Sequence, residues 1–331
     1  MEWLRILAYL GLGFVLLDKG AVWLVGGGGR LARRMGVSAM VVGLTVVAWG
    51  TSAPEVVVSA VAAWHGSPSI SLGNVLGSNV ANIGLVLGVC GLIQPQILRS
   101  RLAPREWLWL FGSLGALWLC CWDRSITRLD AGLLLLLFAA YTLQLWFSAR
   151  EEPQGEAPGS RDRHPVIHVL MGMVAIAFGA ELVTRGAVEG AQELGIQKRV
   201  IGLTVIAVGT SLPELAAGVR SAMRRETEIT LGNVLGSNVF NVLAVIGLVG
   251  LIQPFEVAAG PPDGTERASE LGTTFDSVLR LDLPLVLVFS IAVVLMPFVR
   301  YRGPGRRKAL VLLVAYLVYT WWLYATGQVG G

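Results

Sequence analysis

Charged residues are scarce in this chain. Aspartate, glutamate, lysine and arginine make up 15% of its 331 residues, and 54% are hydrophobic, whereas about a quarter of the residues in an ordinary soluble domain are charged. The few charged residues are placed so that long apolar runs remain between them. A bilayer core about 30 Å thick needs roughly 20 largely apolar helical residues to span it. The composition therefore excludes an ordinary soluble domain and predicts an integral membrane protein.

Cysteine and histidine are scarce as well. Cys90, Cys120 and Cys121 lie in or beside apolar segments, and their spacing fits neither a disulfide framework nor a metal motif. The three histidines form no ligand spacing, and no nucleophile–base pair is evident. These absences argue against an enzyme and against a bound cofactor.

The apolar runs predict an all-α membrane protein with ten transmembrane helices. No soluble domain fits between them, because the two longest connections, 149–165 and 253–281, have the composition of linkers. The predicted spans are 3–25, 38–64, 70–93, 106–122, 130–148, 166–190, 200–221, 229–252, 282–300 and 308–326.

The basic residues predict the orientation of these spans. Positive charge near span ends is retained on the cytoplasmic side. If the amino terminus is outside, the odd-numbered connections are cytoplasmic and carry 17 of the 26 lysines and arginines, so both termini should be outside. This distribution argues against nucleic-acid binding, which needs a contiguous patch. The 17 residues are Arg30, Arg33, Arg34, Arg99, Arg101, Arg105, Arg150, Arg161, Arg163, Arg220, Arg224, Arg225, Arg300, Arg302, Arg306, Arg307 and Lys308.

The sequence contains an internal repeat. Residues 43–95 align with residues 202–254 without a gap, at 29 identities in 53 positions. The identities include polar residues that hydrophobic composition does not explain, among them a glutamate and three asparagines in each copy. One predicted crossing precedes the first copy and six precede the second, so the copies enter the membrane from opposite sides. Inverted repeats of this kind are typical of secondary transporters, whose broken helices form a shared site near the midplane.

The first repeated motif reads GTSAPE at 50–55 and GTSLPE at 209–214. Pro54 and Pro213 lack a backbone N–H and clash with the preceding turn, so each motif predicts a helix break. A break inside the bilayer is tolerated where its backbone lines a cavity or packs in protein. Freed carbonyls, hydroxyls and a carboxylate form an all-oxygen cluster, which suits hard cations such as calcium or sodium.

Glu55 and Glu214 are the strongest candidate site residues. An ionisable side chain in mid-membrane costs about 2.5–3.5 kcal/mol on insertion scales and indicates function by default. The alternative is an ion pair that holds helices together, but neither repeat has a basic residue in its apolar core. Asp18 and Glu181 are left out of the predicted site because each has a basic residue close by in the sequence.

The second repeated motif, GNVLGSNVxN, lies on the next helix of each copy. Its polar residues recur every four positions and share one helix face. These residues could bind the ion or could hydrogen-bond one helix to another. The helix-joining role has more weight for Asn74, Asn233, Asn79 and Asn238 than for the other residues of the motif. Paired glycines, at 73 and 77 and at 232 and 236, predict close helix approach.

These two motifs together resemble the cation/calcium exchangers, specifically the prokaryotic sodium/calcium antiporter branch. The resemblance covers most of the chain and implies two inverted five-helix halves, at 1–148 and 166–331, joined by a cytoplasmic linker at 149–165. It implies four ion sites in a diamond and a location in the cytoplasmic membrane. The implied ion ligands are Ala48, Thr51, Ser52, Glu55, Ser78, Asn82, Ala207, Thr210, Ser211, Glu214, Ser237 and Asn241.

The chain departs from the family pattern at Asn241, where family members often carry Asp. The expected function is exchange of Ca2+ for Na+ by alternating access, and no protein partner is implied. A Ca2+/H+ antiporter remains an alternative, because a buried glutamate can take up protons. A passive cation channel is a further alternative, although channels favour rings of equivalent ligands around an open path.

Overall fold

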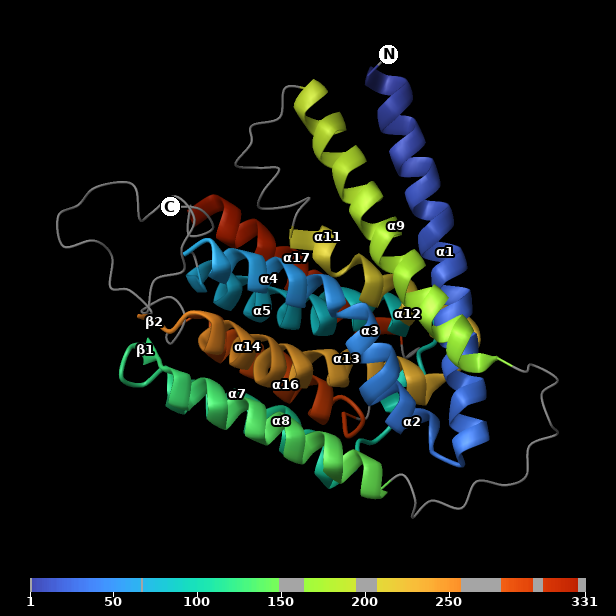
Figure 1. The fold of residues 1–331 in the computed structure, drawn as a ribbon. Helices are drawn as coiled ribbons and strands as arrows, with labels where there is room; N and C mark the ends of the chain where they lie inside the picture. The colour runs from blue at the N-terminus through green and yellow to red at the C-terminus, as the bar shows by residue number, and fades with distance from the viewer. Residues whose placement is uncertain are drawn as a thin grey trace.

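The computed structural model describes residues 2–66, 68–148, 164–194, 207–256, 281–299 and 306–326, and these are almost entirely helical (Figure 1). The only strands in these ranges are two residues long, β1 (Ser125–Ile126) and β2 (Phe255–Glu256), which pair antiparallel. Their pairing joins the turn that follows residue 120 to the segment that follows residue 252. The predicted all-helical class is therefore confirmed for the described part of the chain.

The helices of the first part of the chain match the predicted spans closely, although several are built from more than one segment. They are α1 (Glu2–Met35), α2 (Ala39–Val42), the π-helical turn η1 (Gly43–Val47), α3 (Ala48–Thr51), α4 (Ala53–Trp64), α5 (Pro68–Ala81), the π-helical turn η2 (Asn82–Val86), α6 (Leu87–Ile93), the 3-10 turn η3 (Ile97–Arg99), α7 (Pro104–Cys120) and α8 (Arg128–Ser148).

The second part follows the same succession from its first long helix. Its elements are α9 (Pro165–Glu193), α11 (Ala207–Thr210), α12 (Leu212–Met223), α13 (Thr227–Phe240), the π-helical turn η5 (Asn241–Val245), α14 (Ile246–Ile252), α16 (Leu283–Leu295) and α17 (Arg306–Thr326). Residues 149–163 of the predicted linker at 149–165, and most of the predicted loop at 253–281, lie outside the described residues.

The repeat in the sequence is also a repeat of secondary structure. Elements α4, α5, η2 and α6 have α12, α13, η5 and α14 as their counterparts, and each begins and ends 159 residues after its partner. Even the π-helical turns recur, starting at Asn82 and at Asn241. π-helical turns inside helices are rare and frequently occur at functional sites. Their recurrence therefore indicates that Asn82 and Asn241 are candidate functional positions.

Helices α1 and α9 form an antiparallel pair that lies at a steep angle to the other helices (Figure 1). At one end Arg5 Nε lies 3.0 Å from Glu189 Oε2. Glycines let the two backbones approach closely, and a Cβ added at Gly172 would lie 2.5 Å from the backbone nitrogen of Leu24. The tight contact therefore depends on the missing side chain.

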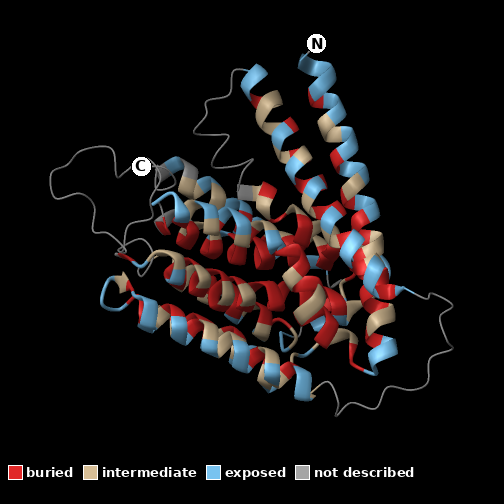
Figure 2. Ribbon diagram, in the orientation of Figure 1, coloured by how far each residue is buried: buried red, intermediate tan, exposed pale blue. Residues whose placement is uncertain are grey.

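Burial separates central helices from peripheral ones (Figure 2). In the most apolar stretch of Thr227–Ile252, 78% of the residues are buried, against 22% in that of Arg128–Ser148. The peripheral helices expose large apolar side chains, including Phe14 on α1, Phe178 on α9 and Trp321 on α17. Apolar side chains on the outside suit a lipid surrounding, where they need no water-excluding cover.

Five described helices are long and apolar enough to cross a membrane: Glu2–Met35, Ser71–Ile93, Arg128–Ser148, Pro165–Glu193 and Thr227–Ile252. A bent pair, Ala39–Thr51 and Ala53–Trp64, qualifies as a sixth when taken together. The predicted spans at 106–122 and 282–300 correspond to shorter helices of 17 and 13 residues. The predicted span at 200–221 begins outside the described residues.

The central helices of the two parts pack closely at glycines of the second motif. A Cβ added at Gly236 would lie 2.5 Å from the carbonyl oxygen of Leu44, and one at Gly232 would lie 2.7 Å from that of Met40. The predicted close approach is thus confirmed in the second copy. In the first copy, the segment that the repeat would place against Gly77 lies outside the described residues.

Candidate functional site

Both GTSxPE motifs interrupt their helices at the serine. Ser52 leaves the helical conformation at φ −85° and ψ 9°, and Ser211 does so at φ −88° and ψ 2°. The helix that follows each serine has the motif proline in its first turn, where a missing N–H costs nothing. In the first copy the two helical pieces meet at 46°. The predicted helix breaks are therefore confirmed.

Glu55 and Glu214 lie in the first turn of the helices that follow these breaks. Both residues are fully buried, and Ser52, which belongs to the same motif as Glu55, contacts the carboxylate of Glu214. A helix amino terminus favours negative charge, because its first N–H groups have no intrahelical partner. Two glutamates 159 residues apart in sequence are thus brought into one buried site.

Glu214 accepts hydrogen bonds from one serine of each copy. The Ser52 hydroxyl donates to Glu214 Oε1 over 2.8 Å, and the Ser237 hydroxyl donates to the same oxygen over 3.4 Å. Ser237 also lies 3.5 Å from the carbonyl oxygen of Ala48, which accepts a bond from Thr51 at 3.2 Å. Five of the predicted site residues therefore form one connected group of oxygen atoms.

The environment of Glu55 differs from that of Glu214, although the two motifs differ at only one position. Among the described residues, neither of its carboxylate oxygens has a hydrogen-bond partner, and the same holds for the buried hydroxyl oxygen of Ser211. One oxygen of Glu214, Oε2, is also unpartnered in this part of the chain. Buried polar atoms are almost always paired, so oxygens left over at a helix break are what a site for a cation requires.

The polar stripe of the second motif joins the site from α5 and α13. Ser78 accepts a hydrogen bond of 3.1 Å from the amide of Asn241. Asn82 and Asn241 are both fully buried and each begins a π-helical turn. The side-chain oxygens of these two asparagines have no hydrogen-bond partner among the described residues. The stripe thus adds two neutral oxygen atoms to the two carboxylates.

Asn233 belongs to the same group, although the sequence prediction left it out. Its amide oxygen accepts a bond of 3.1 Å from the Thr51 hydroxyl, and its amide nitrogen donates to the backbone oxygen of Glu214 over 3.4 Å. Its identity with Asn74 in an apolar segment was the available signal. Asn74 instead donates to Ser59 over 3.2 Å.

Two predicted site residues are less well defined by the structure. Thr210 ends α11 and is partly buried. Ala207 begins the same helix, and only its backbone is described. Both occupy the positions that Thr51 and Ala48 hold in the first copy, so the repeat predicts a similar role for them.

Two acidic residues outside the repeats, Asp18 and Glu181, have ordinary partners. Asp18 lies 3.8 Å from Lys19, and Glu181 pairs with Arg185 on the exposed face of α9. Both were excluded from the predicted site for this reason, and the structure confirms the pairing.

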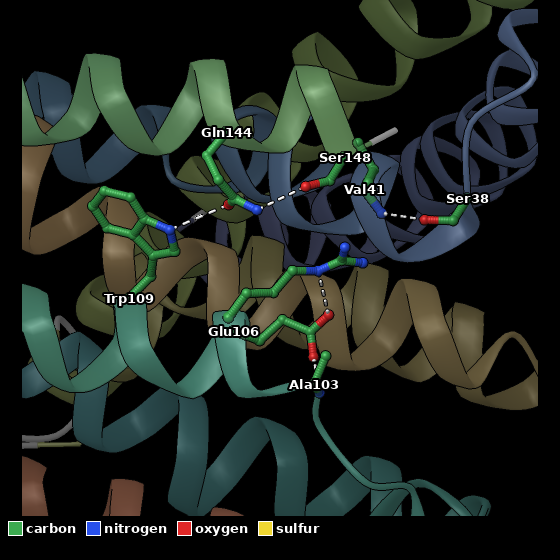
Figure 3. Close-up of polar contacts among 8 residues, drawn as sticks. Ser38, Val41, Ala103, Glu106, Trp109, Gln144 and Ser148 are labelled. Carbon is green, nitrogen blue, oxygen red and sulfur yellow. Dashed lines mark hydrogen bonds and ion pairs between the residues drawn. The ribbon is translucent and has the colours of Figure 1, made fainter. Parts of the chain in front are cut away.

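Glu106, the other buried glutamate in the described ranges, lies at the start of α7 (Figure 3). Its carboxylate accepts the backbone N–H of Ala103 and lies 3.9 Å from the Arg105 guanidinium. Nearby, Trp109 donates to Gln144 over 3.2 Å (Figure 3). Glu106 therefore caps a helix amino terminus, a structural role.

The donor set is made of hard oxygen atoms. Within the described residues, no group of three or more His, Cys, Asp or Glu side chains could hold a metal. The candidate site instead combines two carboxylates with the hydroxyl, amide and carbonyl oxygens around them. Such a set suits Ca2+ or Na+ and disfavours the softer transition metals.

Comparison with known protein families agrees with this chemistry. The family model described as sodium/calcium exchanger protein matches residues 5–147 and 164–325. These two matched stretches contain both copies of the repeat and leave residues 148–163, which include most of the predicted linker, unmatched.

Individual proteins are similar over nearly the whole chain. CaxA of Alkalimonas amylolytica is 34% identical over 326 residues, which covers 95% of this chain and 97% of CaxA. The inner membrane protein YrbG of Escherichia coli is 32% identical over 330 residues, which covers 96% of each chain. A structure of the sodium-calcium exchanger NCX_Mj, soaked with Na+ and Sr2+, matches with a TM-score of 0.76 at 29% identity and covers 96% of this chain and 98% of its own.

Proposed function

Because the chain belongs to the sodium/calcium exchanger protein family, we propose that it exchanges Ca2+ for Na+ across the cytoplasmic membrane. The two ions use one buried site by alternating access. The observation that carries this proposal is the pair of fully buried glutamates, each at a helix break, with Ser52 of the first motif donating to Glu214 of the second over 2.8 Å. Two carboxylates balance the charge of one Ca2+, and the same oxygens suit Na+.

The proposed architecture is two inverted halves of five helices, 1–148 and 166–331, joined by a cytoplasmic linker at 149–165. Three observations support it: the constant shift of 159 residues between the repeated elements, the antiparallel α1 and α9, and hydrogen bonds that join equivalent residues of the two copies. Inverted halves meet near the bilayer midplane, where such transporters bind their ions.

The proposed ion ligands are the residues that the two repeats contribute at the breaks and on the polar stripe. Their buried oxygens support the proposal, since a buried carboxylate oxygen without a donor is costly unless a cation or a proton balances it. The proposed set is Ala48, Thr51, Ser52, Glu55, Ser78, Asn82, Ala207, Thr210, Ser211, Glu214, Ser237 and Asn241.

The coupling ion is tested by calcium flux in sealed vesicles that contain the purified protein. Vesicles loaded with Ca2+ should release it when Na+ is added outside, and an inward proton gradient alone, made by acidifying the outside, should release little. Release that requires the proton gradient and ignores Na+ would instead establish the Ca2+/H+ antiporter, for which the unpartnered Glu55 oxygens could accept a proton. Release that requires neither gradient would establish a passive channel.

We further propose that both termini are outside and that the linker is cytoplasmic, from the basic residues in the odd-numbered connections. In a variant without native cysteines, Gly155→Cys should react with an impermeant thiol reagent only after the membrane is opened. His65→Cys, at an exposed turn on the opposite side, should react in intact cells. The reverse pattern would overturn the orientation.

A further inference from the structure

Two asparagines outside the proposed ligand set, Asn79 and Asn238, bond to each other's backbone across the repeats. Asn79 Nδ2 donates to the backbone oxygen of Asn238 over 3.1 Å, and Asn238 Nδ2 donates to the backbone oxygen of Asn79 over 3.4 Å. Both residues are buried. A backbone carbonyl only accepts hydrogen bonds, so the amide nitrogen of each asparagine must face it. The orientation of both amides is thereby determined.

Once the nitrogen of each amide is committed, its oxygen must face elsewhere. Asn79 Oδ1 accepts from Asn241 Nδ2 over 3.3 Å, and Asn238 Oδ1 accepts from Asn82 Nδ2 over 3.0 Å. The next amide in each chain of hydrogen bonds is oriented in the same way. Because an amide oxygen only accepts, Asn82 and Asn241 must present nitrogen to it. Each of these two amides is therefore left with its oxygen free.

The free oxygens are the ones that a cation needs. Asn82 Oδ1 and Asn241 Oδ1 are buried and have no hydrogen-bond partner in the described ranges. The second N–H of Asn241 is also engaged, by Ser78 at 3.1 Å. An amide turned the other way would direct N–H groups at the ion and repel it. The orientation of these two amides therefore decides whether they act as ligands.

We propose that Asn79 and Asn238 are positioning residues that orient the amides of Asn241 and Asn82 so that their oxygens face the transported cation. This inference rests on the proposed function. Each chain of contacts starts at a backbone carbonyl in one repeat and ends at a ligand oxygen, so the orientation survives when the site is empty of cation. Outer partners of this kind typically change metal affinity by about 10–100-fold.

The two chains of contacts use different atoms. The side chain of Asn238 holds Asn82, whereas Asn79 is anchored by the backbone oxygen of Asn238. Removing the Asn238 side chain therefore leaves the anchor of Asn79 in place. Asn238 should couple to Asn82, and Asn79 should couple to Asn241, with little coupling between the crossed pairs.

A double-mutant cycle tests this pairing with the purified full-length protein. The melting temperature is measured as calcium chloride is added, because a ligand that binds the folded state raises it. Asn238→Ala should raise the half-saturating Ca2+ concentration about tenfold or more. In a chain that already carries Asn82→Ala, the same change should have less than about a twofold effect. Gln94→Ala is the matched control, since it deletes another buried amide that joins the two halves.

A purely structural role predicts a different result. Asn238→Ala would then leave half-saturation as in Gln94→Ala or would act equally in both backgrounds, and either outcome would overturn the inference. A lower melting temperature without Ca2+ is expected on both readings, because two buried hydrogen bonds are lost. If Asn238→Ala does not fold, Asn238→Leu fills the same volume without the amide, and the cycle of Asn79 with Asn241 gives an independent measurement. A wild-type protein that no concentration of Ca2+ or Na+ stabilises would instead refute the proposed function itself.

Discussion

Glu214→Gln and Glu55→Gln are each expected to abolish calcium transport and leave a folded protein in the membrane. Each substitution removes one of the two negative charges in the buried site. Two unit charges about 4 Å apart attract by roughly 4 kcal/mol at an effective dielectric of about 20, and Ca2+ carries two charges. Since about 1.4 kcal/mol is a factor of ten, Ca2+ binding should weaken by at least about a hundredfold.

Calcium uptake into vesicles measures this effect. Glu106→Gln is the matched control, because Glu106 is also buried and lies outside the repeats, where it caps α7. The control should transport like the wild type. Near-normal uptake by a purified Glu55→Gln or Glu214→Gln protein would remove that glutamate from the ion site. Equal loss in all three variants would point to a general effect of losing a buried carboxylate.

Asn241→Asp is expected to change the cation dependence of exchange and to introduce a new dependence on pH. Asn241 donates one N–H to Asn79 Oδ1 and the other to Ser78. Asn79 cannot turn its nitrogen to receive a carboxylate without breaking its bond to the backbone of Asn238. An ionised Asp would therefore place two oxygens against each other and would add a third negative charge to the site.

The direction of the pH effect follows from the same contacts. A protonated Asp has one O–H and can still donate to Asn79, so the variant should resemble the wild type at low pH and diverge from it as the pH rises. At high pH the extra charge should lower the Na+ concentration needed for half-maximal calcium release. Sodium-dependent efflux from vesicles, measured across pH, gives both quantities.

Gln94→Glu is the control for this substitution. It makes the same amide-to-carboxylate change at a buried position, but its partner there is the Thr227 hydroxyl, which can turn to donate. Its Na+ and pH dependence should match the wild type. If a folded Asn241→Asp protein matches it too, residue 241 does not take part in the ion site.

Several features of this protein follow from short stretches of sequence. The helix breaks at Ser52 and Ser211 were predictable because a proline two positions later removes a backbone donor, whatever surrounds it. The identical Glu55 and Glu214 could be recognised as site residues because an ionisable group in an apolar run is costly. The many identities between the two copies also explain why α4, α5, η2 and α6 recur with the same bounds 159 residues later.

Contacts between the copies were decided by the tertiary structure. Identical motifs can pair within a copy or across copies, and no local rule distinguishes the two. Only the folded chain brings Ser52 to Glu214 and Thr51 to Asn233. It also makes the environments of the two glutamates unequal, since Glu214 accepts two serine hydroxyls while Glu55 accepts none in the described part of the chain.

The sequence alone therefore determined which residues are polar inside the membrane and where each helix breaks, because both depend on a residue and its immediate neighbours. The tertiary structure decided which way each buried amide faces. A sequence shows that Asn82 and Asn241 carry both a donor and an acceptor, but the choice between them depends on Asn238 and Asn79 of the facing helix. That choice arises only when the helices pack, because a hydrogen bond requires its partner within about 3 Å.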